Sequence, residues 1–179
     1  MLTEATKTLA NQFAKLSLVA RNGQRLDGLA DEIENSQQGD GNTKPCLVTT
    51  ISVDYSNLAS YLPQLKEALK RNGPPNLVLA WMRTSARDAV IETAKAVSEK
   101  ATQTIPFFDI RSSAASKPGF FDDRKEEVSA IPNIYYHKVA LGCIRENGIQ
   151  RWLTHPEICE GVLAAISKRA DSFLVGKAL

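Results

Sequence analysis

Hydrophobic positions along the chain follow two different spacings. Short apolar runs, rich in branched side chains, predict strands that are buried on both faces. They cover residues 16–20, 46–53, 76–82, 105–110, part of 134–144, and 172–175. Apolar positions three or four residues apart predict amphipathic helices. This helical spacing runs through positions 2, 5, 9, 13 and 16 and returns over 24–34, 58–69, 85–100 and from 154 onward.

The alternation of strands and helices predicts an α/β fold with a mostly parallel sheet and helices on both faces. Right-handed crossovers would bring the carboxyl ends of the strands to one edge, where such sheets bind ligands. The residues that follow the predicted strands are therefore the candidates for a site. They are Arg21, Asn22, Asp54, Tyr55, Trp81, Met82, Arg83, Ser112, Ser113, Gly142 and Ile144.

Local signals refine three segments. Thr154 and Glu157 have the spacing of a capping box, which predicts the start of the last helix. The segment 122–130 is rich in charge and predicts a surface helix. The polar segment 34–45, with two Gly and a Pro, predicts an exposed loop within one domain.

Composition narrows the class of protein. The chain has 179 residues, which fits about one domain. Its 22 basic and 20 acidic residues give a net charge of +2, so no strong attraction to nucleic acid or anionic membranes is expected. The longest apolar run, 77–82, is far shorter than the roughly 20 residues that span a bilayer.

Cysteine usage indicates a reducing compartment. Cys46, Cys143 and Cys159 are scattered, odd in number and without metal-ligand spacing. We therefore expect three buried thiols, no disulfide framework and no metal site. The first residues also lack the apolar core of a secretory signal, so a cytoplasmic location is expected.

Four segments, in chain order, resemble the short-chain dehydrogenase/reductase family. They are FAKLSLVARNGQRLDGLADEI (13–33), VDYS (53–56), ALGCI (140–144) and EICEGVLAAISKRADSFLVG (157–176). A further segment, RWLTH (151–155), resembles small bacterial proteins of this kind. The resemblance implies that residues 1–179 form one NAD(P)-binding, Rossmann-like three-layer domain.

The resemblance also implies where a dinucleotide would bind. A basic residue at Arg21 favours the 2′-phosphate of NADP(H) over NAD(H), and Arg25 lies one helical turn further on. Asn22 and Tyr55 adjoin this position, and Asp54 would accept a hydrogen bond from the adenine amino group. Two alternatives stay open: both arginines are solvated charges at a helix start, and Asp54 caps the following helix.

Other candidates map onto the nicotinamide side. Ala80 and Trp81 occupy the place of the family's Asn-Asn-Ala-Gly turn, where Trp81 either packs in the core or stacks on the cofactor. Ile144 would meet the nicotinamide carboxamide through its backbone. Ser112 or Ser113 would hold the position of the catalytic serine; otherwise this serine pair belongs to a loop.

The N-terminal part departs from the family pattern. The family begins with a strand and a glycine-rich turn that holds the pyrophosphate, whereas this sequence has no Gly before Gly23. We therefore expect that the sequence starts just after the position of the phosphate loop. Either it is a fragment, or its start codon was assigned too far downstream. We expect the usual first strand to be absent, which leaves its two neighbours unpaired or makes them pair directly.

The catalytic pattern departs as well. The family uses a Tyr activated by a Lys four residues later, and none of the four tyrosines here has that partner. His137, within a predicted strand, is either a buried histidine or a replacement acid/base. The resemblance thus implies an NADP(H)-dependent oxidoreductase acting on a small carbonyl or alcohol, or a member that binds the nucleotide without this catalysis. The alternative is a cofactor-free regulatory or interaction module, and self-association into a homo-oligomer is left open.

Overall fold

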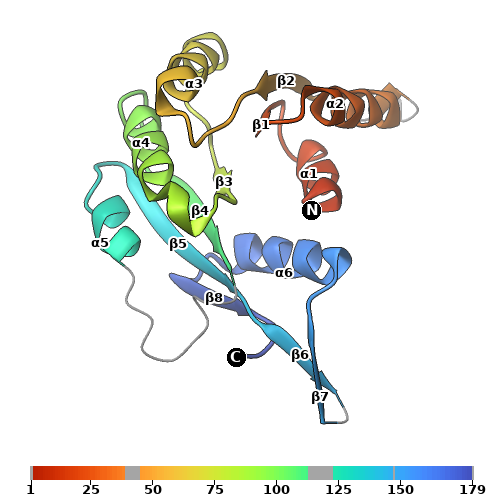
Figure 1. Cartoon of the computed structure of the whole chain (residues 1–179). Coiled ribbons are helices and arrows are strands. Elements are labelled where there is room, and N and C mark those ends of the chain that lie inside the picture. Colours follow the sequence, from red (N-terminus) through yellow and green to blue (C-terminus); the bar gives the residue numbers. More distant parts are fainter. Residues whose placement is uncertain (1, 39–44, 113–122, 147, 179) are drawn as a thin grey trace. The chain divides into compact units, whose positions relative to one another are not determined.

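The computed structural model describes residues 2–38, 45–112, 123–146 and 148–178. The chain divides into two compact units, Leu2–Gly73 and Pro74–Leu179, here called the N-terminal unit and the C-terminal unit. Each unit has helices and a parallel sheet of its own (Figure 1).

The N-terminal unit has a two-stranded parallel sheet. Its elements are α1 (Thr3–Ala10), β1 (Lys15–Ala20), α2 (Gly23–Gln38), β2 (Leu47–Ser52) and α3 (Leu58–Asn72). The pairing runs from Lys15 opposite Leu47 to Ala20 opposite Ser52. Because both strands end at the same level, the residues after Ala20 and after Ser52 lie next to each other.

A small core joins this sheet to α1 and α2. Leu18 of β1 and Leu26 of α2 are buried within it. The buried side chain of Gln37 also connects three segments: its amide donates to the carbonyl of Ala10 at 3.1 Å, and its oxygen accepts from the N–H of Cys46 at 2.7 Å. Gln37 thereby satisfies two buried backbone groups where α1 ends and β2 is about to begin.

The C-terminal unit has a four-stranded parallel sheet in the order β3-β4-β5-β8 and an antiparallel β6–β7 hairpin. Its elements are β3 (Val78–Ala80), the 3₁₀ turn η1 (Thr84–Ala86), α4 (Arg87–Ser98), β4 (Ile105–Arg111), α5 (Asp123–Ser129), β5 (Ile134–Leu141), β6 (Cys143–Glu146), β7 (Ile149–Trp152), α6 (His155–Lys168) and β8 (Ser172–Val175). The central strand β4 is buried at six of its seven residues, as expected for a strand covered on both faces.

Helices cover both faces of the four-stranded sheet, so this unit is three-layered (Figure 1). Arg124 of α5 reaches Asp109 of β4 on one face. The register places Val175 of β8 on the opposite face, where α6 packs closely. A Cβ atom on Gly161 of α6 would lie 2.2 Å from a methyl group of Val175, so this contact requires glycine.

A buried charged cluster fastens α5 to the sheet. The guanidinium of Arg124 donates to the carboxylate of Asp109 at 3.2 Å and to the carbonyl of Thr84 at 3.2 Å. Tyr136 of β5 donates to the same carboxylate at 2.8 Å, and Arg111 lies 3.5 Å from it. Burial raises the pKa of Asp109, while the charges of Arg124 and Arg111 and the hydrogen bond from Tyr136 oppose that rise. The cluster ties together α5, β4, β5 and the turn after β3.

The structure confirms the expected element order, with some corrections. All six predicted strands and the predicted helices are present, and the capping box of Thr154 and Glu157 forms. The prediction of 122–130 as a surface helix was wrong in one respect: Arg124 and Val128, four residues apart, are buried against the sheet. The β6–β7 hairpin was not predicted. Helix α2 extends into the expected loop 34–45, whose residues 39–44 lie outside the described part.

Two strands have a single strand partner each. Within the described ranges, β1 pairs with β2 alone and β3 pairs with β4 alone. Val19 of β1 and Val78 of β3 are half-buried.

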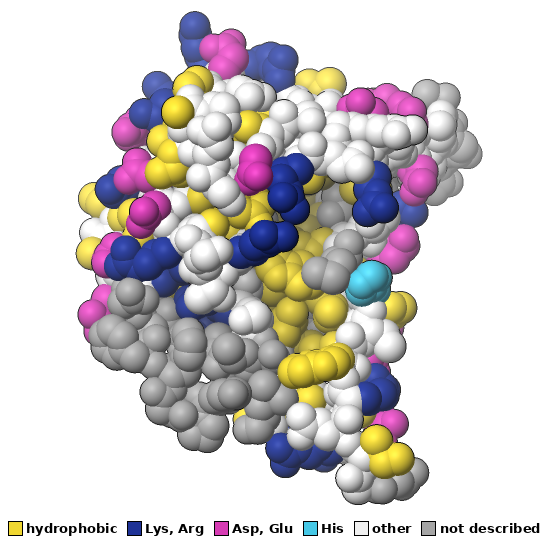
Figure 2. Space-filling view, in the orientation of Figure 1, with side chains coloured by type: hydrophobic (Ala, Val, Ile, Leu, Met, Phe, Trp, Pro, Cys, Tyr) yellow, Lys and Arg dark blue, Asp and Glu magenta, His cyan; other side chains and the backbone are white. Residues whose placement is uncertain are grey.

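The charge distribution agrees with the nearly balanced composition. Basic and acidic side chains are intermixed over the face shown in Figure 2. None of the helices in the described part is long and apolar enough to cross a membrane. The three cysteines are buried, as expected.

The buried charged cluster around Asp109 leads to a prediction about stability. Asp109→Asn leaves the guanidinium groups of Arg124 and Arg111 buried without this counter-charge, so we expect the C-terminal unit to lose about 3–5 kcal/mol. Both tryptophans, Trp81 and Trp152, lie in this unit, so tryptophan fluorescence during urea unfolding measures the change. The control Asp88→Asn removes an exposed partner of Arg87 and should cost less than about 1 kcal/mol. Equal effects of the two substitutions would contradict the conclusion that the charge of Asp109 stabilises the buried cluster.

Candidate functional site

Five predicted residues gather where β1 and β2 end: Arg21, Asn22, Arg25, Asp54 and Tyr55. We call this group the β1–β2 edge. Backbone hydrogen bonds continue past the strands, because Val53 N–H donates to the carbonyl of Ala20 at 3.0 Å. The hydroxyl of Ser52 donates to the carbonyl of Arg21 at 3.4 Å. The parallel register of the two strands therefore places these residues together.

Asn22 sets the position of Arg25. Its side-chain oxygen accepts from the N–H of Arg25 at 3.0 Å, and its carbonyl accepts from the N–H of Leu26 at 3.1 Å. Asn22 is thus the N-cap of α2. The capped end of this long helix carries a partial positive charge. Among the described residues, the exposed guanidinium of Arg25 makes no ion pair.

Asp54 lies close to Arg21. Its carboxylate is 3.7 Å from the Arg21 guanidinium, and its other oxygen accepts from the N–H of Ser56 at 2.9 Å. The alternative that Asp54 caps the next helix was wrong: Asn57 is the N-cap of α3 and accepts from the N–H of Ser60. Asp54 instead closes the turn between β2 and that cap. Tyr55, the next residue, is half-buried.

Chemically, the β1–β2 edge suits an anion. Two guanidinium groups, of Arg21 and Arg25, lie beside a capped helix N-terminus, which is a favourable setting for a phosphate. The carboxylate of Asp54 next to them supplies a hydrogen-bond acceptor. Both arginines stand at the start of a helix, which is also what the alternative of two solvated charges expects. The fold itself places them there, and no ligand is needed to hold them.

The remaining candidates lie in the C-terminal unit. Ala80 ends β3 and is buried opposite Asp109, and Trp81 follows it half-buried. Ser112 is exposed directly after β4, and Ser113 lies outside the described residues. His137 is fully buried within β5, with its Nδ1 3.0 Å from the carbonyl of Ala170. This burial fits the structural alternative for His137.

Ile144 follows the turn at Gly142 that ends β5. It lies on β6, opposite Arg151 of β7, so its backbone is part of the hairpin. The turn before it is tight: a Cβ atom on Gly142 would lie 2.0 Å from the carbonyl oxygen of Lys177. Cys143 and Lys177 exchange two backbone hydrogen bonds of 2.8 Å. The chain after β8 is therefore paired with the start of the hairpin.

The sequence interpretation missed the cluster around Asp109, although a signal was present. Asp109 is an acidic residue inside the apolar run IPFFDI, and a buried carboxylate needs cationic or hydrogen-bonding partners. Those partners, Arg124 and Tyr136, lie far along the chain, so the run itself could not identify them.

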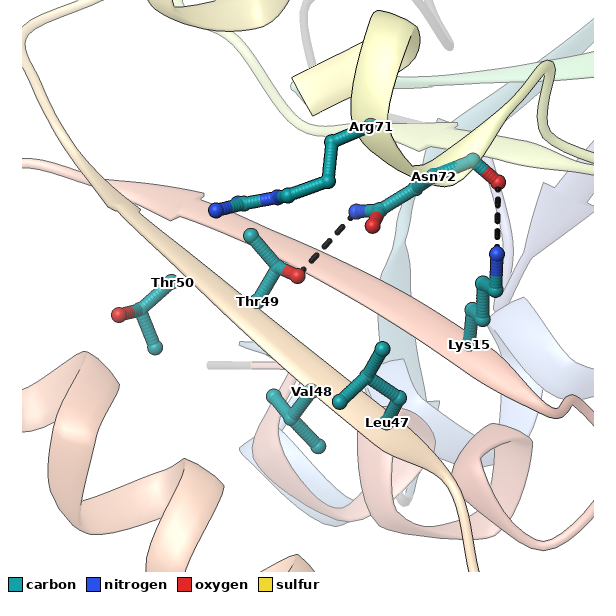
Figure 3. A pocket seen from close by; sticks show the side chains of 7 residues that line it. All are labelled: Lys15, Leu47, Val48, Thr49, Thr50, Arg71 and Asn72. Atoms are coloured by element: carbon teal, nitrogen blue, oxygen red, sulfur yellow. Dashed lines mark hydrogen bonds between the residues drawn. The ribbon is translucent and has the colours of Figure 1, made fainter. Parts of the chain in front are cut away.

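An open groove of about 440 Å³ lies between the end of α3 and β2 and contains none of the predicted residues (Figure 3). Asn72, at the end of α3, donates to the hydroxyl of Thr49 at 3.1 Å, and Lys15 donates to the carbonyl of Asn72 at 3.2 Å. These contacts hold the end of α3 on the sheet. Arg71, which also lines the groove, is exposed.

Comparisons with known proteins identify the fold. No protein-family model matches the sequence, and no curated protein matches it either. Among solved structures, a short-chain dehydrogenase/reductase from Serratia marcescens is similar with a TM-score of 0.67 at 14% identity, covering 99% of this chain and 93% of that one. An alcohol dehydrogenase from Thermococcus sibiricus, complexed with 5-hydroxy-NADP, gives 0.62 at 17% identity, covering 96% and 89%. A ketone-specific alcohol dehydrogenase from Comamonas testosteroni gives 0.64 at 17%, covering 96% and 80%.

The chain has the short-chain dehydrogenase/reductase fold. This confirms the expected fold class, a Rossmann-like α/β architecture. Of the residues expected on the nicotinamide side, Ile144 lies in the β6–β7 hairpin, and Trp81 is half-buried after β3.

The β6–β7 hairpin, which contains Ile144, leads to a prediction about pH dependence. Arg151 binds Glu157 with two hydrogen bonds of 2.9 Å and so fastens β7 to α6. This interaction, together with hydrogen bonds from Thr154, lowers the pKa of Glu157 from 4.5 to about 2. Because the folded-state pKa is depressed, the stabilisation is present above pH 4.5 and is lost as the pH falls toward 2.

Glu157→Gln should therefore lower the melting temperature at pH 6, and the gap to the unsubstituted protein should narrow between pH 4.5 and 2. The control Glu160→Gln removes the same charge from an exposed position on the same helix and should show no such trend. A gap that stays constant over this range would count against the Arg151–Glu157 interaction.

Proposed function

We propose that the chain binds a nicotinamide adenine dinucleotide phosphate, with the adenosine 2′-phosphate at the β1–β2 edge. The observation that carries this proposal is the pair of arginines, Arg21 and Arg25, beside the N-terminus of α2 that Asn22 caps. A 2′-phosphate needs cationic donors at this end of the strand, whereas NAD(H) usually calls for an acidic residue there. The proposal therefore favours NADP(H) over NAD(H), and both units together form the nucleotide-binding domain.

The proposed reaction class is oxidation or reduction of a small alcohol or carbonyl. The similar structures include alcohol dehydrogenases, one of them complexed with 5-hydroxy-NADP. The dinucleotide, when bound, would supply hydride chemistry. In this chain Ser112, exposed at the end of β4, would hold the carbonyl oxygen by a hydrogen bond. Since no Tyr has a Lys four residues later, catalysis needs another acid/base group, and nucleotide binding without turnover fits the residues equally well.

A second candidate is a cofactor-free regulatory or interaction module. The observation that favours it is that β1 and β3 each have one strand partner among the described residues. An unpaired strand edge can accept an extended segment of another polypeptide through main-chain hydrogen bonds. This function would need neither arginine of the β1–β2 edge.

A thermal-shift titration tests the proposed function. Saturating NADPH, at about 100 times its Kd, should stabilise the protein by about 2.7 kcal/mol, and NADH at the same concentration should stabilise it less. Arg25→Ala should weaken NADPH binding about tenfold or more, because it removes a charge-assisted hydrogen bond to the phosphate.

The matched control is Arg71→Ala, which removes an exposed arginine of α3 that lines the groove along β2 and should leave NADPH binding unchanged. No stabilisation of the folded protein by either nucleotide would reject cofactor binding and favour the interaction module. Equal loss in both arginine variants would show that binding depends on net charge and not on the β1–β2 edge. NADPH oxidation in the presence of small carbonyls separates an enzyme from a nucleotide-binding protein.

A further inference from the structure

The carboxylate of Asp54 is engaged within the protein through both of its oxygens. One accepts from the N–H of Ser56 at 2.9 Å, and the other is 3.7 Å from the guanidinium of Arg21. The two side chains are partly exposed, at 44% for Asp54 and 59% for Arg21. The ion pair therefore lies in the same solvent-accessible region that a phosphate would enter.

The backbone enforces this pair. Val53 N–H donates to the carbonyl of Ala20, and the Ser52 hydroxyl donates to the carbonyl of Arg21. These bonds fix the chain on both sides, directly before Asp54 and at Arg21 itself. Arg25, in contrast, lies one turn along α2 and forms no ion pair among the described residues. The two arginines thus differ in electrostatic surroundings, although both lie at the β1–β2 edge.

We infer that Asp54 is a positioning residue that competes with a bound phosphate for Arg21 and so limits the affinity for 2′-phosphorylated nucleotides. This inference rests on the proposed function. An exposed ion pair of this kind is weak, so a phosphate can displace the carboxylate from Arg21. Loss of the ion pair then reduces the net free energy gained when the phosphate binds. Arg25 then supplies the larger share of phosphate affinity, and Arg21 contributes only after leaving Asp54.

This role differs from direct adenine recognition. If Asp54 accepted a hydrogen bond from the adenine amino group, removal of its charge would weaken binding. If Asp54 acts through Arg21, removal of its charge strengthens binding. The two roles therefore predict opposite signs for the same substitution.

The test is Asp54→Asn, which keeps a side-chain oxygen to accept from the Ser56 N–H while removing the charge. The probe is adenosine 2′,5′-bisphosphate, titrated calorimetrically at low salt. We expect binding to tighten by about three- to fivefold, the range set by the small free energy of an exposed ion pair. Asp31→Asn, an exposed residue further along α2, removes the same charge and should change the affinity by much less.

A double substitution shows whether the effect passes through Arg21. In an Arg21→Ala background, Asp54→Asn should no longer tighten binding, because the competing partner is gone. Arg21→Ala alone should cost less affinity than Arg25→Ala. A gain that persists without Arg21 would overturn the inference, because the carboxylate would then act on the phosphate directly.

Adenosine and inosine 2′-monophosphates provide a second readout, because inosine lacks the amino group. The inference expects Asp54→Asn to tighten binding of both to the same degree. A preference for adenosine that disappears in Asp54→Asn would overturn it in favour of adenine recognition. If the unsubstituted protein binds the bisphosphate well and Asp54→Asn binds it more weakly or equally well, the inference is overturned and the proposed function is not. Absence of binding by both proteins overturns the proposed function and the inference with it.

Discussion

Parallel pairing is the constraint on which the arrangement of candidate residues depends. Parallel strands that start and end in register bring their carboxyl ends to one edge of the sheet. In the N-terminal unit this register sets Arg21 beside Asp54, although 32 residues separate them in the numbering. In the C-terminal unit it sets Ala80 beside Asp109. Neither pair would meet if the strands ran in opposite directions.

The two units stabilise these edges by different means. At the β1–β2 edge, hydrogen bonds between residues close in sequence fix the backbone: Asn22 caps the helix that follows it, and Asp54 closes the turn that it begins. In the C-terminal unit, the edge is held by the buried pair of Asp109 and Arg124, which joins a strand to a distant helix. Exposed groups fixed by local bonds are free to exchange partners with a ligand, whereas a buried pair cannot do so without a large desolvation cost. This difference is the physical reason to seek phosphate binding at the first edge.

The sequence was a good guide to what local pattern determines. Strand β8, at 172–175, and the capping box of α6 were predicted with correct bounds because their signals lie within a few residues. The residues of the β1–β2 edge lie together as the predicted parallel strands imply, since each directly follows a strand or starts a helix. The β6–β7 hairpin was not predicted, because its two strands are only four residues long and the short turn signal Asn147-Gly148 between them was not interpreted. The partners of Asp109 could not be predicted, because burial of Arg124 depends on how α5 packs and not on its charged sequence.

The single strand partner of β3 has a consequence for how the protein behaves at high concentration. Residues Val78–Ala80 are apolar and carry no lysine or proline, so the shortness of this strand is the protection of its edge. β1 is longer and carries a lysine, Lys15, at its start. Such edges act as templates for further strands, so unfolding is not required for aggregation to begin. The association rate of folded molecules, and not thermal stability alone, would then determine how long concentrated solutions stay clear.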